Sequence, residues 1–192
     1  MNTLKAEKRS MDVKAKRLRR EGYVTGNLFG REIEGSIPLK FTKKEIEVLL
    51  KNNNKGSQVM LELDGKTYDA LIKEVDYNPL AHTVEEVDFQ ALVSNEMVHS
   101  TAEIILENEE KVLSGVLQDE LKEVAYKALP ADLVDKIKVD VAGMKIGDTL
   151  RVKDLEIAKN KNIHITTDLE AVIATVTPVH NVVPETETET EE

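Results

Sequence analysis

The sequence predicts a mainly β protein with some α-helix, an α+β fold, made of a barrel-like N-terminal domain and a β-rich C-terminal domain. Most apolar residues lie in short runs that alternate with polar residues, as in half-buried strands. Glycine, proline and Asp-Gly steps separate these runs. Residues 13–21 and 42–52 have instead the composition of helices, so we expect two or more helices in the first domain. The predicted domains are residues 1–92 and 93–181, and residues 182–192 form a separate acidic tail.

The first expected elements are a strand at residues 3–9 and a helix at residues 13–21. Gly22 follows this helix and suits the left-handed conformation that ends many helices. Residues 23–35 carry three glycines among apolar residues. We expect an irregular strand there, with either a bulge or a tight backbone approach.

The second helix has the clearer start signal. Thr42 and Glu45 have the spacing of a capping box, and one apolar stripe follows them. Asp64-Gly65 lies between two alternating segments and predicts a two-residue hairpin turn. The other elements of this domain are expected at residues 36–41 (strand), 58–63 and 66–75 (hairpin strands), 76–83 (a turn, with Pro79 ending the strand) and 84–92 (strand).

The C-terminal domain gives weaker signals. A strand is expected at residues 98–107, and the domain ends on a strand within residues 166–179. Residues 115–129 fit a strand or a helix equally well, and residues 131–155 have the texture of short strands and turns. The tail lacks the apolar surface that would offset its ordering entropy, so we expect disorder.

Charge is distributed unevenly along the chain. The formal net charge is −10, yet residues 1–31 hold nine Lys and Arg against three Asp and Glu. Residues 93–181 hold ten basic residues against sixteen acidic ones. This asymmetry favours a polyanion partner for the basic end, and the alternative is a solvated, salt-bridged helix face.

Several function classes find no support in the sequence. Cysteine is absent, so disulfides and thiol chemistry are excluded, and the four histidines are scattered without metal-ligand spacing. No nucleotide-binding or hydrolase motif occurs, so we expect no enzyme activity, no metal and no cofactor. The polar N-terminus and the lack of an apolar run of about 20 residues predict a cytoplasmic protein without a membrane partner.

The basic segment is the remaining functional signal. On a helix, Lys16, Arg19 and Arg20 share a face, and Arg17 borders it and can pair with Glu21. Such cations match an anionic phosphate ladder, and arginine adds planar hydrogen bonding. The nearby glycines would allow close approach of a partner, whereas Phe29 has core packing as its simpler explanation.

Three stretches resemble one family, the bacterial large-subunit ribosomal protein L twenty-five in its two-domain form called general stress protein Ctc. They are RLRREGYV with LFG within residues 17–30, NPLAHTVEEVDFQAL at 78–92 and GVLQDELKEVAYKALPADLVDKIKVDVAGMKIGDTLRVKDL at 115–155. The resemblance extends to about residue 179. It implies a small N-terminal β-barrel with helices that binds 5S ribosomal RNA at loop E, an appended β-rich domain, and no enzymatic activity.

The resemblance also implies where RNA would bind. Arg17, Leu18 and Arg19 match the family's R-L-R run, and Phe29-Gly30 stands where the family usually has Tyr-Gly. Together with the charge argument, the candidate RNA-binding residues are Arg9, Lys14, Lys16, Arg17, Arg19, Arg20, Phe29, Gly30 and Arg31. The expected partners are 5S rRNA, the large ribosomal subunit and neighbouring ribosomal proteins, and the free protein is expected to be a monomer.

This chain also departs from the family pattern. The loop before the arginines is shorter and offers only Lys14, and two positions that are often histidine are Asn78 and Glu86. A carboxylate at residue 86 would repel a phosphate. The alternative function is therefore a diverged, stress-related protein-interaction module with weakened or lost rRNA binding.

Overall fold

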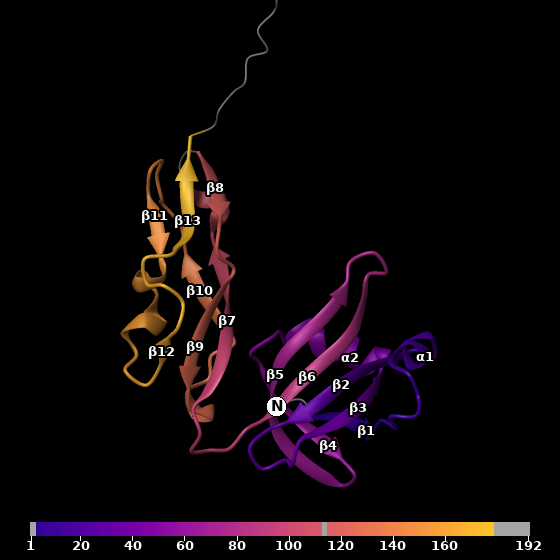
Figure 1. Ribbon diagram of the computed structural model, residues 1–192. Helices are drawn as coiled ribbons and strands as arrows, with labels where there is room; N and C mark the ends of the chain where they lie inside the picture. Colours follow the sequence, from indigo (N-terminus) through magenta and orange to yellow (C-terminus); the bar gives the residue numbers. More distant parts are fainter. Residues whose placement is uncertain (1–2, 113–114, 179–192) are drawn as a thin grey trace, which may run out of the picture.

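The computed structural model describes residues 3–112 and 115–178 and is built mainly of β-strands (Figure 1). The mainly β fold with helices predicted from the sequence is confirmed, with a barrel first and a β-rich region after it. The predicted tail at residues 182–192 lies outside the described residues, as does the end of the segment predicted as the last strand. The separate domains with a boundary near residue 93 stay a prediction.

Six strands close the N-terminal barrel in the order β1-β3-β2-β6-β5-β4. β1 runs parallel to β4 and β2 runs parallel to β6, while the other neighbours are antiparallel. Closure leaves this sheet without a free edge. The strands are β1 (Thr3–Lys8), β2 (Tyr23–Phe29), β3 (Ser36–Thr42), β4 (Gln58–Leu63), β5 (Lys66–Asn78) and β6 (Thr83–Ala91), and the helices are α1 (Ala15–Arg20) and α2 (Lys43–Asn52).

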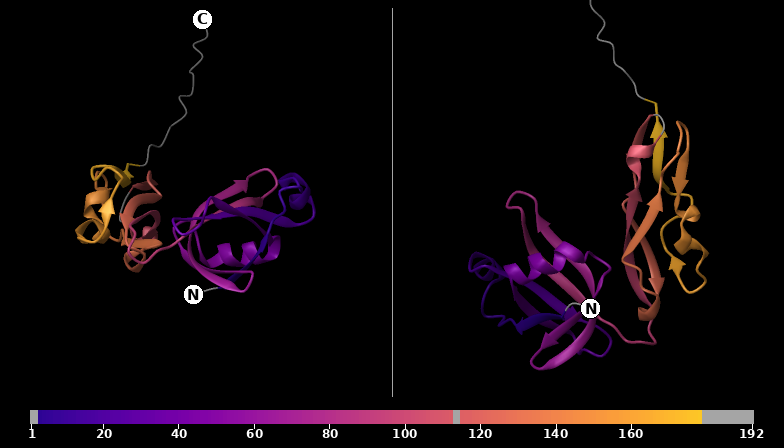
Figure 2. Two further views of the ribbon diagram at one scale, coloured as in Figure 1. Left: turned by 60° about the horizontal axis from the view of Figure 1, so that its bottom comes forward. Right: turned by 180° about the vertical axis from the view of Figure 1, so that it is seen from behind.

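The barrel interior is filled by apolar side chains from alternate strand positions. Phe41 and Phe89 are buried, with ring centroids 5.5 Å apart. Helix α2 lies across one end of the barrel, where Ile46 and Leu49 complete the core (Figure 2). The predicted capping box is confirmed, because Thr42 accepts from the Glu45 backbone N–H and the Glu45 side chain accepts from the Thr42 N–H.

Turn chemistry agrees with the sequence at two predicted positions. Asp64 and Gly65 have φ of +50° and +75°, as a type I′ hairpin turn between β4 and β5 requires. Gly22 has φ of +90° at the end of α1. The possible bulge in β2 is wrong, because β2 pairs with β3 in unbroken register. The tight approach is present instead: a Cβ on Gly26 would lie 2.1 Å from the Val87 carbonyl oxygen.

The second region, residues 98–178, contains two small sheets with strand orders β10-β7-β9-β12 and β11-β13-β8. The ambiguous segment at residues 115–129 forms two strands, because Val124, Tyr126 and Ala128 alternate into the core of this region. The strands are β7 (Val98–Glu107), β8 (Val116–Asp119), β9 (Glu123–Ala128), β10 (Lys136–Asp140), β11 (Thr149–Arg151), β12 (His164–Ile165) and β13 (Val172–Thr177), and short 3-10 helices lie at Glu109–Lys111, Pro130–Asp132, Val152–Asp154 and Glu156–Lys159.

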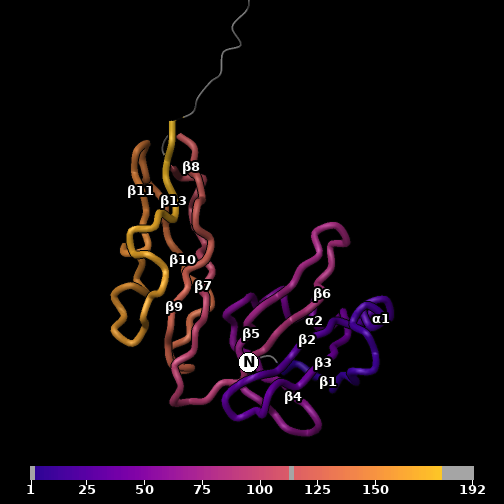
Figure 3. Tube along the Cα trace, in the orientation of Figure 1, coloured from indigo at the N-terminus to yellow at the C-terminus, as the bar shows by residue number. Residues whose placement is uncertain are grey.

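The chain passes from the barrel to the second region between β6 and β7 (Figure 3). Helix α1 lies on the side of the barrel that faces away from the second region (Figures 1 and 2). The hairpin of β5 and β6 extends beyond the barrel wall and carries the turn at Pro79. The predicted basic helix is therefore at one outer side of the molecule.

Candidate nucleic-acid interface

Helix α1 is held on the barrel by one apolar side chain. Leu18 is buried, while the side chains before and after it on the helix are exposed or half-buried. Lys14 has extended backbone at the N-cap position, and the backbone N–H groups of Glu21 and Gly22 close the last turn onto helix carbonyls. Because Leu18 must point inward, the short helix leaves Lys16, Arg17 and Arg20 on its exposed side.

Three of these cations are exposed and form no ion pair within the described residues: Lys14, Lys16 and Arg20. Arg17 is also exposed, but its Nε donates to Glu21 Oε1 at 2.8 Å, and this hydrogen bond raises the pKa of Arg17. We call Lys14, Lys16, Arg17 and Arg20 the α1 basic face. Most of the predicted RNA-binding cations that are exposed belong to this face, so a phosphate could reach them there.

Arg19 has a different role from the one its sequence position suggested. Its side chain is half-buried and reaches β6, where Nη1 lies 2.9 Å from Glu85 Oε2 and Nη2 lies 3.4 Å from Glu86 Oε2. Its Nε donates to the backbone carbonyl of Glu85 at 3.2 Å. Arg19 therefore fastens α1 to the barrel and does not share the exposed face of Lys16 and Arg20.

Carboxylates gather beside this contact. Glu74 on β5 lies opposite Asp88 on β6, and Asp76 lies opposite Glu86, so two like-charged cross-strand pairs share one surface. They line a hollow of about 190 Å³. We call these four residues the β5–β6 carboxylates. Like charges directly opposite each other destabilise a sheet, and an anionic ligand is repelled there.

The structure compensates this charge with internal donors. The Asn27 side chain donates to Glu86 at 3.2 Å and to Asp88 at 3.0 Å, and the Asn27 backbone N–H donates to Asp88 at 2.9 Å. Burial raises the pKa of Glu86, and the neighbouring Asp88 raises it further, while Arg19 opposes the shift. The sequence by itself gave no signal of this role for Asn27.

Sequence reasoning singled out Glu86 but missed Glu74 and Asp76. A signal was present: KEVD at residues 73–76 and EEVD at residues 85–88 lie on the two strands of one hairpin. Antiparallel pairing with the observed register places the carboxylates of these two segments opposite one another. The register itself, which has two irregularities in β5, was not readable from the sequence.

The other predicted site residues divide into two groups. Arg9 is half-buried, and its Nη2 donates to the Val13 carbonyl at 3.2 Å, so it shapes the loop that enters α1. Phe29, Gly30 and Arg31 lie at the far end of β2 from α1, roughly 20 Å along the strand. A Cβ on Gly30 would lie 2.9 Å from the Ala91 Cβ, so this glycine serves close packing. Arg31 is exposed.

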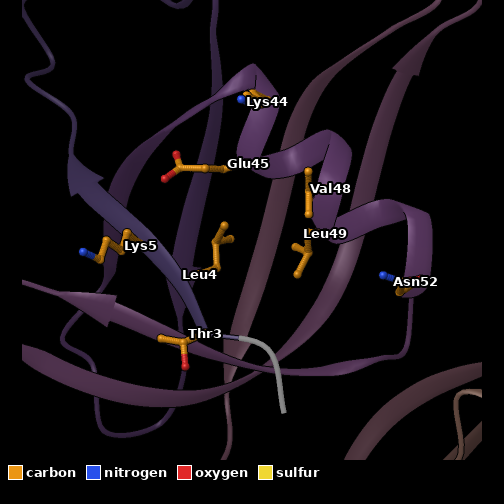
Figure 4. A pocket seen from close by; sticks show the side chains of 8 residues that line it. All are labelled: Thr3, Leu4, Lys5, Lys44, Glu45, Val48, Leu49 and Asn52. Carbon is orange, nitrogen blue, oxygen red and sulfur yellow. The ribbon is translucent and has the colours of Figure 1, made fainter.

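A larger hollow lies elsewhere. It measures about 690 Å³ and opens between β1 and α2, with Leu4 and Leu49 facing each other at its centre (Figure 4). Its carboxylate, Glu45, is held by the capping box. It contains none of the predicted site residues, and its polar side chains do not converge on a point.

Two other features, a metal site and a membrane-spanning helix, are not found in the described residues. No group of three or more His, Asp or Glu side chains there has the arrangement of a metal site. No helix in residues 3–112 and 115–178 is long and apolar enough to cross a membrane.

Both parts of the chain are similar to known ribosomal proteins. The sequence model of the Ribosomal L25p family matches residues 4–89, and that of the Ribosomal protein TL5, C-terminal domain, matches residues 97–180. The chain is 32% identical over 173 residues to large ribosomal subunit protein bL25 of Carboxydothermus hydrogenoformans, covering 89% of this chain and 85% of that protein. The chain belongs to the ribosomal L25p family.

Other L25p-family proteins agree with this assignment. The bL25 of Moorella thermoacetica is 31% identical over 182 residues, covering 92% of this chain and 86% of its own length. The bL25 of Bacillus velezensis is 30% identical over 183 residues, covering 93% and 89%. The predicted two-part family resemblance is confirmed, and so is the prediction that the chain is not an enzyme, because L25p-family proteins are structural ribosomal proteins.

Proposed function

We propose that this L25p-family protein is a component of the large ribosomal subunit and binds 5S rRNA through its N-terminal barrel. The observation that carries the proposal is the α1 basic face, which has three cations without an ion-pair partner in the described residues, on one outer side of an otherwise acidic protein. RNA helices present phosphates and 2′-hydroxyls across a wide, shallow minor groove. A rigid cationic helix on a barrel wall is suited to such a surface.

The charge distribution also suggests how the RNA would lie. The β5–β6 carboxylates would repel phosphates, and Arg19 is held by Glu85 and Glu86. The RNA backbone would therefore approach the outer side of α1, with Arg31 as a separate contact at the far end of β2. By family resemblance, the proposed binding region of the RNA is loop E. The alternative, an interaction module without rRNA binding, is not favoured by the family matches.

Replacing Lys16 and Arg20 together by glutamate tests the proposed contact. Both side chains are exposed and unpaired in the described residues, so the fold should be unaffected. We expect 5S rRNA affinity to fall by at least about 100-fold at moderate salt, since each reversed charge turns a phosphate attraction into a repulsion. A filter-binding or gel-shift titration measures this.

The matched control changes Lys159 and Lys161, two exposed lysines of the second region, to glutamate. It alters the net charge equally and should leave 5S affinity within about threefold of the unmodified protein, because long-range effects are screened. Equal losses in both double variants would remove α1 from the proposed contact.

Association with the large subunit is tested separately. Cell lysate is sedimented through a sucrose gradient at low salt, and the protein is followed by antibody across the ribosomal fractions. We expect it in the large-subunit and whole-ribosome peaks, and expect the Lys16→Glu/Arg20→Glu variant near the top. Recovery of the unmodified protein only near the top would contradict the proposal.

A further inference from the structure

A second cationic site lies on the opposite side of the barrel from α1. A groove of about 300 Å³ opens between the loop before β4, strand β5 and strands β7 and β9 of the second region. We call it the barrel–sheet groove and define it by Lys55, Gly56, Lys73, His99, Thr101 and Ala125. None of the predicted RNA-binding residues lines it.

Specific contacts hold the two walls of the groove together. Lys73 Nζ donates to the His99 carbonyl at 2.7 Å, and Lys55 Nζ lies 3.6 Å from Glu123 Oε2. A Cβ on Gly56, where φ is +89°, would lie 1.9 Å from the Thr101 carbonyl oxygen. Only glycine permits this approach, so the groove is built by close backbone packing and its shape is defined.

Lys73, His99 and Lys127 lie together at one part of this groove: Lys73 bonds to the His99 carbonyl, and Lys127 lies opposite His99 on β9. Burial lowers the pKa of Lys73, and the neighbouring Lys55 lowers it further. The pKa of His99 is lowered by burial and by Lys127 and Lys73. Lys127 is not part of the lining but lies opposite His99 in the pairing of β7 with β9. Within the described residues, Lys73 and Lys127 form no ion pair. Carboxylates also lie near the groove: Glu74 on its lining, Glu123 beside Lys55, Glu103 beside Asn54 and Asp135 beside Ser57. The charge of Lys55 is therefore compensated, whereas Lys73 and Lys127 are left without an ion-pair partner in the described residues.

Unused hydrogen-bond donors accompany this charge. An ammonium group has three donor hydrogens, and Lys73 uses one of them on the His99 carbonyl. The Thr101 hydroxyl is buried and has no hydrogen-bond partner in the described part of the chain. This hydroxyl is closed off from solvent, so the donors that remain for a ligand are the other two ammonium hydrogens of Lys73.

We propose that the barrel–sheet groove binds a phosphate group through Lys73, His99 and Lys127. Phosphate offers several acceptor oxygens and a negative charge, which match the spare donors of Lys73 and the two lysines that form no ion pair in the described residues. The phosphate can come from the backbone of the rRNA or from a free phosphorylated molecule. The site goes beyond the proposed 5S contact at α1, and only its assignment to the rRNA rests on that proposed function.

The first experiment uses the full chain and inorganic phosphate as the probe. The imidazole signals of His99 are followed by NMR while sodium phosphate or sodium chloride is added at matched ionic strength, and a His99→Gln variant assigns them. We expect phosphate, but not chloride, to shift these signals and to raise the pKa of His99. Lys73→Gln and Lys127→Gln should each weaken phosphate binding roughly threefold to tenfold.

The control is Lys145→Gln, which removes an exposed lysine of the second region that does not line the groove. It should leave the phosphate response unchanged. Lys127→Gln is the decisive variant if Lys73→Gln loosens the contact between the walls, because Lys127 is exposed and makes no such contact. A His99 response that is equal for phosphate and chloride, or equal in Lys127→Gln and Lys145→Gln, would overturn the site.

The second experiment distinguishes the two sources of phosphate. 5S rRNA affinity is measured as a function of salt for the unmodified protein and for Lys73→Gln/Lys127→Gln. A loss of affinity with a salt slope reduced by about 1 assigns the phosphate to the rRNA backbone. Unchanged RNA binding with a lost phosphate response assigns it to a free phosphorylated molecule. If the unmodified protein binds no 5S rRNA, the proposed function fails while the NMR result still decides the groove.

Discussion

At the scale of single residues, Glu86 and Arg19 decide how the basic segment can be used. Glu86 lies opposite Asp76 and next to Asp88, and Arg19 and Asn27 compensate it through direct contacts. Arg19 is therefore a structural cation. Lys16 and Arg20 are exposed, lie one turn apart on the same helix and form no ion pair within the described residues.

Replacing Glu86 by glutamine should stabilise the protein at neutral pH. The pKa of Glu86 is raised in the folded state, so the folded chain binds the proton more tightly than the unfolded chain. Stability therefore falls as pH rises through the window above the usual glutamate pKa, and the penalty is complete above the folded pKa. We expect Glu86→Gln to gain about 0.2–1 kcal/mol at pH 7, the range for cross-strand charge pairs, and to gain less at pH 4.

Urea unfolding at both pH values measures this difference. Glu32→Gln, at an exposed loop position, is the charge-matched control and should change stability little at either pH. A Glu86→Gln variant that is less stable than the parent at pH 7 would show that the ion pair with Arg19 outweighs the carboxylate repulsion.

At the scale of elements, α1 combines a side attached to the barrel with an exposed basic side, the proposed binding side, within six residues. Leu18 and Arg19 attach it to the barrel, and the α1 basic face remains outside. A helix this short is not stable by itself, so its geometry depends on these attachments. Loss of an attachment and loss of a phosphate contact should therefore give different measurements.

A matched pair of arginine variants separates these two roles. Arg19→Met should lower the free energy of unfolding by about 1–2 kcal/mol, because Glu85 and Glu86 lose a charged hydrogen-bond donor. Arg20→Met removes the same charge at an exposed position and should leave stability unchanged while it weakens 5S binding several-fold. Thermal unfolding and filter binding on both variants provide the readouts. If Arg20→Met lowered stability and Arg19→Met only weakened 5S binding, the roles assigned to the two arginines would be wrong.

At the scale of the whole molecule, the basic helix and the acidic second region lie on different sides. Helix α1 lies on the side of the barrel away from the second region (Figure 1), and the second region is acidic overall. An RNA that meets α1 would therefore keep most of the acidic surface at a distance, where salt screens the repulsion.

This arrangement predicts a moderate salt dependence of RNA binding. If the three unpaired cations Lys14, Lys16 and Arg20 each neutralise one phosphate, the slope of log affinity against log salt should be about −2 to −3. Affinity should then fall roughly 20- to 40-fold between 50 and 200 mM salt. Titrations at four salt concentrations measure the slope. A slope near zero would mean that phosphate contacts do not drive the binding.

The sequence by itself determined the elements whose signals are local. The capping box at Thr42, the hairpin turn at Asp64-Gly65 and the helix end at Gly22 depend on neighbouring residues and standard backbone conformations, so each was predictable. The barrel with a following β-rich region was also predictable, from alternation and from family resemblance. The clustering of basic residues in the first thirty positions needed only counting.

Only the tertiary structure decided which cations remain available and where charges oppose each other. Arg19 and Glu85 are 66 positions apart, and Lys73 and His99 are 26 apart. The strand order and register of the closed barrel bring such residues together, and both depend on long-range packing. For the same reason residues 115–129 became two strands: their apolar side chains had a core to enter only once the other strands of the second region were in place.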